Sequence, residues 1–102
     1  MTKNLILITD KVCDYSGYLS DEQYFVFMNI ARGEFIKENN INNLLKYNEF
    51  KLVIHKHIKL GDEIFVVVEK SETDNKIIFR EVIYDQSNNL MATGDSIFSY
   101  KA

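Results

Sequence analysis

The residues with the clearest chemical potential are Asp14 to Tyr24, which read Asp-Tyr-Ser-Gly-Tyr-Leu-Ser-Asp-Glu-Gln-Tyr. They bring one acidic side chain and one glycine close to the start of a predicted helix. Ser20 and Gln23 have the spacing of a capping box, and the first amides of a helix have no acceptor within it. A carboxylate facing such amides can activate water against a carbonyl, while the amides stabilise the oxygen that becomes negative. The stretch is therefore a candidate site for carbonyl hydrolysis.

Length, charge and cysteine content limit the fold and its partners. We expect the 102 residues to form one domain, residues 1–102, and the small core of such a domain favours oligomerisation. The net charge of −3, with acidic and basic residues interspersed, gives no field that would attract a polyanion, so we expect no nucleic acid partner. The single cysteine, Cys13, excludes an intrachain disulfide framework and is expected to be a small, inert buried residue.

Targeting and membrane signals are weak in this sequence. The N-terminal residues lack the long apolar segment and cleavage site of a signal peptide. No apolar run approaches the roughly 20 residues that span a bilayer, so we expect no membrane segment. These features predict a cytoplasmic protein.

The apolar pattern predicts one strand, one long helix and four further strands. Residues 5–13 have the pattern of a strand that is buried at its start. From Asp21 to about Lys37, apolar residues recur at helical spacing and extend far around the helix, so it should be buried on most sides. The asparagine-rich residues 39–43 end it. Strand-like runs then cover 50–58, 63–69, 76–84 and 90–100, and the short turns between them predict antiparallel neighbours in a meander.

Several short motifs lie in a particular order along the chain. They are Asp14-x-x-Gly17-Tyr18-Leu19, Tyr24, Ala31-Arg32 with Phe35, Leu60-Gly61-Asp62-Glu63, and Leu90-x-Ala92-Thr93-Gly94. In this order they resemble the hotdog-fold thioesterases, in particular the group of 4-hydroxybenzoyl-CoA thioesterase and the YbgC-type acyl-CoA thioesterases. The resemblance covers nearly the whole chain. It implies an α+β hotdog fold, in which a curved antiparallel sheet of about five strands wraps a long central helix.

The resemblance also implies a reaction and its site. In that group an aspartate at the position of Asp14 acts on a thioester as nucleophile or general base, and an amide at the helix start, here that of Asp21, polarises the carbonyl. Gly17, Tyr18 and Tyr24 are the candidates for substrate binding, and no cofactor or metal is expected. The substrate would be an acyl-CoA or an acyl-carrier protein. Because the group's active site lies between subunits, the resemblance implies a homodimer and leaves a homotetramer open.

Each candidate also has a simpler structural explanation. Asp14 can accept the amide of Ser16 or Gly17 in an Asx-turn, and Tyr24 can be a core residue. The acids Asp21 and Glu22 depart from the group's pattern, as does the short connection after the helix; both side chains are expected to complement the helix dipole from the solvent side. A non-catalytic hotdog domain that binds an acyl thioester or fatty ligand therefore remains an alternative. The His and Glu pair of a hydroxyacyl-thioester dehydratase is not recognisable.

Other polar residues give weaker signals. His55 and His57 would share one face of a strand with a spacing that can chelate zinc, but further ligands are missing, so we expect them at the surface or in an interface. Some basic side chains are candidates for contacts with CoA phosphates, or else for a solvated face: Lys51, Lys56, Lys59 and Arg80.

Overall fold

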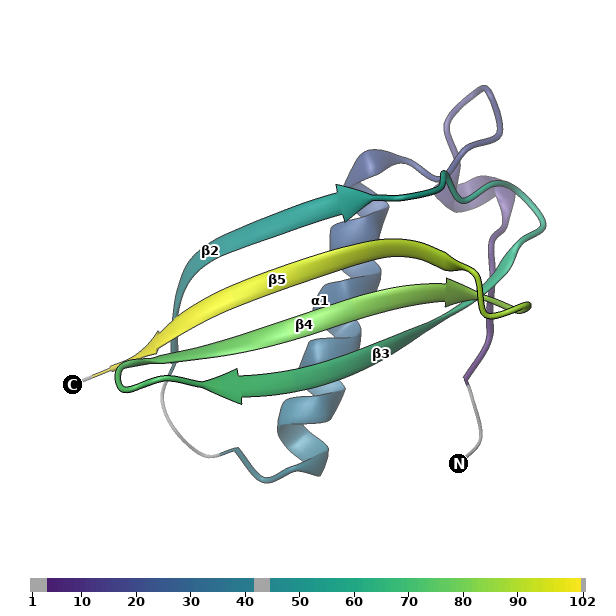
Figure 1. Cartoon of the computed structure of the whole chain (residues 1–102). Helices are drawn as coiled ribbons and strands as arrows, with labels where there is room; N and C mark the ends of the chain where they lie inside the picture. The colour runs from purple at the N-terminus through teal and green to yellow at the C-terminus, as the bar shows by residue number, and fades with distance from the viewer. Residues whose placement is uncertain (1–3, 42–44, 102) are drawn as a thin grey trace.

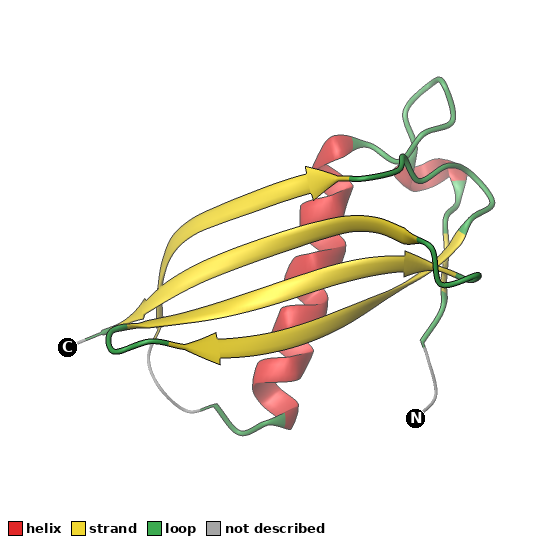
Figure 2. Ribbon diagram, in the orientation of Figure 1, coloured by secondary structure: helices red, strands yellow, loops and turns green. Residues whose placement is uncertain are grey.

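The structure is a computed structural model that describes residues 4–41 and 45–101 (Figure 1). Along the chain it contains β1 (Ile6–Leu7), the 3-10 turn η1 (Asp10–Val12), α1 (Asp21–Glu38), β2 (Leu45–Ile54), β3 (Glu63–Glu72), β4 (Lys76–Asp85) and β5 (Leu90–Tyr100). One helix crosses one face of a curled antiparallel sheet, as Figure 2 shows. The predicted α+β architecture is confirmed. Among the described residues, no helix combines the length and apolar character needed to cross a membrane.

The strand order differs from the predicted meander. The sheet runs β1-β3-β4-β5-β2, so β3, β4 and β5 pair in sequence as predicted, whereas β2 pairs with β5 and not with β3. β2 ends at Ile54 and not at Ile58, so a longer connection than the predicted tight turn precedes β3. Residues 55–62 therefore form a connection that carries the chain from one edge of the sheet toward the other.

The first strand is shorter than predicted. β1 contains only Ile6 and Leu7, which pair with the start of β3. The prediction of a strand to Cys13 is wrong because the polar residues that follow form a turn, in which the amide of Val12 donates to the carbonyl of Thr9 at 3.3 Å. Cys13 then forms an isolated bridge with Leu19.

The helix begins and ends where the sequence predicts, but its surroundings differ. Its buried stripe consists of Tyr24, Met28 and Arg32, which are four residues apart. The expectation of burial on most sides is wrong for the single chain, because Ile30 is 54% exposed. The predicted capping box is also absent. The side chain of Ser20 makes no capping hydrogen bond, and the backbone carbonyl of Ser20 accepts the amide of Gln23 instead.

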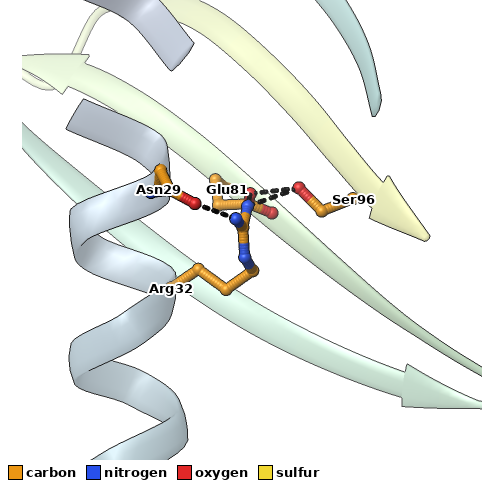
Figure 3. A network of polar contacts seen from close by, with 4 residues as sticks. All are labelled: Asn29, Arg32, Glu81 and Ser96. Carbon is orange, nitrogen blue, oxygen red and sulfur yellow. Dashed lines mark hydrogen bonds and ion pairs between the residues drawn. The ribbon is translucent and has the colours of Figure 1, made fainter. Parts of the chain in front are cut away.

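Two apolar clusters lie between α1 and the sheet. The larger one surrounds the first half of the helix and includes Tyr24, Met28, Ile58 and Ile83. The smaller one, under the second half, is built from Ile77, Phe79 and Phe98. Between them lies a buried polar network of Arg32, Glu81, Ser96 and the neighbouring Asn29 (Figure 3).

Gly94 allows the helix to lie close to β5. A Cβ atom at this position would lie 2.5 Å from the sulfur of Met28 and 2.9 Å from the ring of Phe50. Both distances are too short for ordinary side-chain contact. Glycine is therefore required here by close packing.

Candidate active site

The predicted site begins in a tight loop between Cys13 and Leu19, which stands out from the body of the molecule near the start of α1 (Figure 1). The amide of Asp14 donates to the carbonyl of Tyr18 at 2.8 Å, and the amide of Gly17 donates to the carbonyl of Asp14 at 3.1 Å. Gly17 has a φ of +85°, which side chains disfavour. Gly17 thus shapes the loop, as its turn-forming interpretation predicts.

Inside the loop the carboxylate of Asp14 is exposed and hydrogen-bonded. Its Oδ1 accepts the amide and the hydroxyl of Ser16, at 2.9 Å and 2.7 Å, and the amide of Tyr18 at 3.1 Å. These bonds, led by the Ser16 hydroxyl, hold the pKa of Asp14 below its ordinary value. The Asx-turn expected for this residue is therefore present, and the carboxylate is ionised at neutral pH.

Three of the predicted site residues border one open pocket of about 750 Å³: Asp14, Tyr18 and Asp21. Asp21 is the first residue of α1, so its amide precedes the intrahelical hydrogen-bond ladder. The pocket therefore combines an ionised carboxylate with the N-terminus of a helix. The other lining residues are Leu19, Lys56, His57, Lys59, Asp62, Asp85 and Met91.

Tyr24 lies in the core and not among the residues that line this pocket. Its side chain is completely buried, and its hydroxyl oxygen accepts the amide of Ile58 at 3.0 Å. This bond ties the first turn of α1 to the connection between β2 and β3. The core interpretation of Tyr24 is confirmed, while its predicted contact with substrate remains a prediction.

Much of the pocket wall comes from the connection of residues 55–62, which the sequence had assigned mostly to a strand. The carbonyl of Gly17 accepts the amide of Leu60 at 2.9 Å, and Tyr18 bridges to Lys59, so this connection is attached to the Asp14 loop. The ring of His57 meets the ring of Tyr18 edge-on, with centroids 6.1 Å apart. The sequence signal that marks this wall is the basic run Lys56-His57-x-Lys59.

The expected pairing of His55 and His57 on one strand face is wrong, because both follow the end of β2. His55 is exposed, and its Nε2 lies 3.1 Å from the hydroxyl oxygen of Thr93. Within the described part of the chain, no group of three or more His, Cys, Asp or Glu side chains is arranged to hold a metal ion. The basic candidates also divide: Lys56 and Lys59 line the pocket, whereas Lys51 and Arg80 border a second depression.

Two further titratable groups lie near the pocket. Asp85 is buried and accepts the amides of Ser87 and Asn89, each at 2.9 Å, and the Asn89 side chain contributes most to holding its pKa below the ordinary value. Desolvation, followed by the negative charges of Asp14 and Asp10, raises the pKa of the Cys13 thiol. A raised pKa keeps this thiol protonated, so Cys13 has little nucleophilic character.

No protein-family model matches the sequence, and neither does any curated protein. Solved structures are similar in fold. One is a thioesterase from Thermus thermophilus complexed with coenzyme A and zinc, with a TM-score of 0.82 and 14% identity over 98% of this chain and 78% of that one. Another is a 1,4-dihydroxy-2-naphthoyl-CoA thioesterase from Synechocystis, with a TM-score of 0.81 and 12% identity over 98% and 81%.

A third similar structure is a Staphylococcus aureus protein in complex with CoA, with a TM-score of 0.82 and 15% identity over 98% of this chain and 72% of that one. At such low identity, the likeness concerns the arrangement of the backbone. The single helix on a curled five-stranded sheet agrees with it. The chain therefore has the hotdog fold.

Proposed function

We propose that this protein hydrolyses an acyl thioester of coenzyme A or of an acyl-carrier protein to the free acid and the thiol. The observation that carries the proposal is that Asp14 and the first residue of α1 border one pocket. The carboxylate supplies a negative group near the carbonyl, and the helix start supplies an amide for the oxygen. The CoA bound in similar structures supports this class of substrate.

Two routes use the same groups. In the first, Asp14 takes a proton from water, the resulting hydroxide attacks the carbonyl carbon, and the C–S bond breaks as the thiolate receives a proton. In the second, the Asp14 carboxylate attacks directly, expels the thiolate and forms an anhydride that water then hydrolyses. In both routes the Asp21 amide donates to the oxygen that becomes negative, a contribution of about 10² to 10³ in rate.

Four carboxylates line the pocket, but basic side chains in one part of its wall can meet an anionic carrier. Lys56 and Lys59 line the pocket together with His57, and their positive charges can meet phosphate groups. We further propose a homodimer whose second subunit closes the pocket. In support, Tyr18, which lines the pocket, is 48% exposed, and the outer edge of β2 is unpaired within the described chain.

A thiol-release assay over short, long and aromatic acyl-CoA substrates, repeated with acylated carrier protein, tests the proposal. Asp14→Asn and Asp14→Ala should lower kcat/KM by about 10² to 10⁴. Asp10→Asn is the matched control, because Asp10 is an exposed aspartate in η1 that does not line the pocket. Full turnover by both Asp14 variants would remove this carboxylate from the mechanism.

The three donors on Oδ1 of Asp14 favour the second candidate, a domain that binds an acyl thioester without cleaving it. A carboxylate with a lowered pKa is a weak base, and its hydrogen bonds must rearrange before it reaches a substrate. Calorimetric binding of acyl-CoA with no release of thiol over hours would favour this candidate. Thiol release that depends on Asp14 would exclude it.

A further inference from the structure

Both histidines of the chain lie within the part that the structure describes, and of the two only His57 borders the pocket with Asp14. His57 belongs to the connection of residues 55–62, which lies at the same end of the molecule as the loop before α1 (Figure 1). Its side chain is exposed. Imidazole is the side chain best suited to take and give protons near neutral pH. His57 is therefore a candidate for proton transfer in the pocket.

The position of the His57 ring follows from a short antiparallel pairing between this connection and the loop before α1. Tyr18 pairs with Lys59, and the amide of Leu19 donates to the carbonyl of Ile58 at 2.8 Å. Side chains alternate along such a pairing, so Leu19 and Ile58 are buried while Tyr18 is exposed. His57, two residues before Lys59, lies diagonally across from Tyr18, and their rings meet edge-on. The pairing thus holds the imidazole on the pocket side.

The ring nitrogens of His57 are open to a ligand. Within the described residues no group forms a hydrogen bond with this ring, whereas Nε2 of His55 lies 3.1 Å from the hydroxyl oxygen of Thr93. The charged side chains that line the pocket with His57 are Asp14, Asp21, Asp62, Asp85, Lys56 and Lys59. The pocket therefore holds one imidazole among four carboxylates and two ammonium groups.

The other groups of the pocket are poorer bases than an imidazole. Carboxylates in general bind a proton much more weakly. Asp85 also accepts two backbone amides and the side chain of Asn89, each at 2.9 Å, and Oδ2 of Asp62 accepts the amide of Lys59 at 3.0 Å. An ammonium group has no lone pair to accept a proton. A water molecule in this pocket would therefore give its proton most readily to His57.

The state of Asp14 indicates which route of hydrolysis needs such a base. The three donors on Oδ1 keep this carboxylate ionised and make it a weak base. An ionised carboxylate can still attack a carbonyl carbon, and Asp14 is then part of an anhydride with no free charge to activate water. The second step of this route therefore requires another base in the same pocket.

We propose that His57 is this base and acts in the second step of hydrolysis, an inference that rests on the proposed thioesterase function. In the first step Asp14 attacks the carbonyl carbon, the C–S bond breaks, and the thiolate takes a proton from solvent. In the second step water gives one proton to His57 while its oxygen bonds to the acyl carbon, and the bond from that carbon to the Asp14 oxygen breaks. His57 then returns its proton to solvent, and the products are the thiol and the carboxylic acid.

Kinetics of thiol release from an acyl-CoA that the wild type cleaves test this role. His57→Gln removes the base of the second step only, so kcat should fall by about 10²-fold while kcat/KM for thiol release stays within about twofold of wild type. Rapid mixing of this variant should show a burst of one thiol per active site before the slow turnover. His55→Gln is the matched control and should behave as wild type, because His55 lies in the same connection but does not line the pocket.

Chemical rescue gives a second, independent measurement. The pocket is open, so free imidazole can reach the space that His57→Ala leaves. Added imidazole should raise kcat of His57→Ala and leave kcat of Asp14→Ala unchanged, because the latter lacks the first step. Rescue of this kind requires a proton transfer at the position of the lost ring, which a purely structural role would not show.

Several results would overturn the role of His57. They are an unchanged kcat in both His57 variants, a parallel fall of kcat and kcat/KM without a burst in folded protein, or no rescue by imidazole. Circular dichroism of each variant establishes that it is folded. None of these results contradicts thioester hydrolysis itself, as long as thiol release by the wild type depends on Asp14. No release by the wild type from any acyl thioester would overturn the proposed function and this inference together.

Discussion

Arg32 of α1 and Glu81 of β4 form an ion pair inside the molecule, with Nη1 2.9 Å from Oε1 and the Glu81 side chain fully buried. The hydroxyl of Ser96 donates to the same Oε1 at 2.6 Å and accepts from Nη1 at 2.7 Å. Oε2 of Glu81 has no hydrogen-bond partner among the described residues. The pair is therefore shielded from water, and each charge relies on the other for its compensation.

Removing one member should be costly. Arg32→Ala leaves the Glu81 carboxylate buried without its counter-charge, and we expect a loss of about 3 to 5 kcal/mol in unfolding free energy by urea titration. The double variant Arg32→Met/Glu81→Leu replaces the pair with apolar groups and should recover most of that loss. Arg80→Ala, which breaks the exposed pair with Asp95, is the comparison and should cost at most about 1 kcal/mol in dilute protein. Equal losses for both arginines would contradict a special role for burial.

The same pair should give stability an unusual dependence on pH. Desolvation is the main reason that the pKa of Glu81 is raised in the folded protein. The folded state then binds the proton more tightly than the unfolded chain, so the contribution of Glu81 to stability is largest in acid and is lost as pH rises through its raised pKa. The measurement compares unfolding free energies of wild type and Glu81→Gln across this range. The wild-type value minus the variant value should fall with rising pH, and an unchanged difference would show that Glu81 titrates normally.

Two glycine substitutions should change stability in opposite directions. Gly94→Ala places a methyl group against Met28 and Phe50, and we expect a loss of about 1 to 3 kcal/mol from overpacking. Gly33→Ala lies in α1, where a new Cβ has no neighbour within 4 Å, and should gain about 0.5 to 1 kcal/mol from helix propensity. Thermal unfolding compares both with wild type. A stable Gly94→Ala would show that the helix has room to move away from β5.

Ser16→Ala should raise the pKa of Asp14, because it removes the strongest of the bonds that stabilise the ionised carboxylate. An NMR titration of the Asp14 carboxyl carbon measures this pKa directly. Asp85 is an internal reference, because the substitution leaves its hydrogen-bond donors unchanged. If Asp14 carries hydrolysis, the acid limb of kcat/KM should move to higher pH by the same amount. A pKa unchanged by the substitution would mean that the backbone donors alone hold the carboxylate.

The elements that the sequence predicts best are those with a strong local pattern. The bounds of α1 and β5 agree with the hydrophobic periodicity, and β3 and β4 differ only at their ends. The predictions of β1 and β2 are less accurate. The polar residues of η1 interrupt the first predicted strand, and β2 ends before its apolar pattern does. The pairing of β2 with β5 is a long-range choice that local pattern does not contain.

The candidate site divides in a similar way. A turn-forming glycine and a helix start are local signals, and they place Asp14, Tyr18 and Asp21 around one pocket. The position of His57 in the pocket wall depends on the path of residues 55–62 across the molecule. This path follows from the order of strands in the sheet, which local sequence does not contain. The sequence also gives no local sign that Arg32 and Glu81 are buried, because their burial depends on the contact between α1 and β4.

The position of β5 inside the sheet has a consequence for synthesis of the chain. β5 lies between β4 and β2, yet residues 90–100 follow all the other strands in sequence. While the ribosome is still making residues before 90, β2 has no strand to join, and its backbone groups remain open to water or to other chains. Emergence of β5 then closes the sheet across a long sequence separation, a type of contact that forms slowly. The nascent chain is thus most exposed to aggregation just before β5 leaves the exit tunnel.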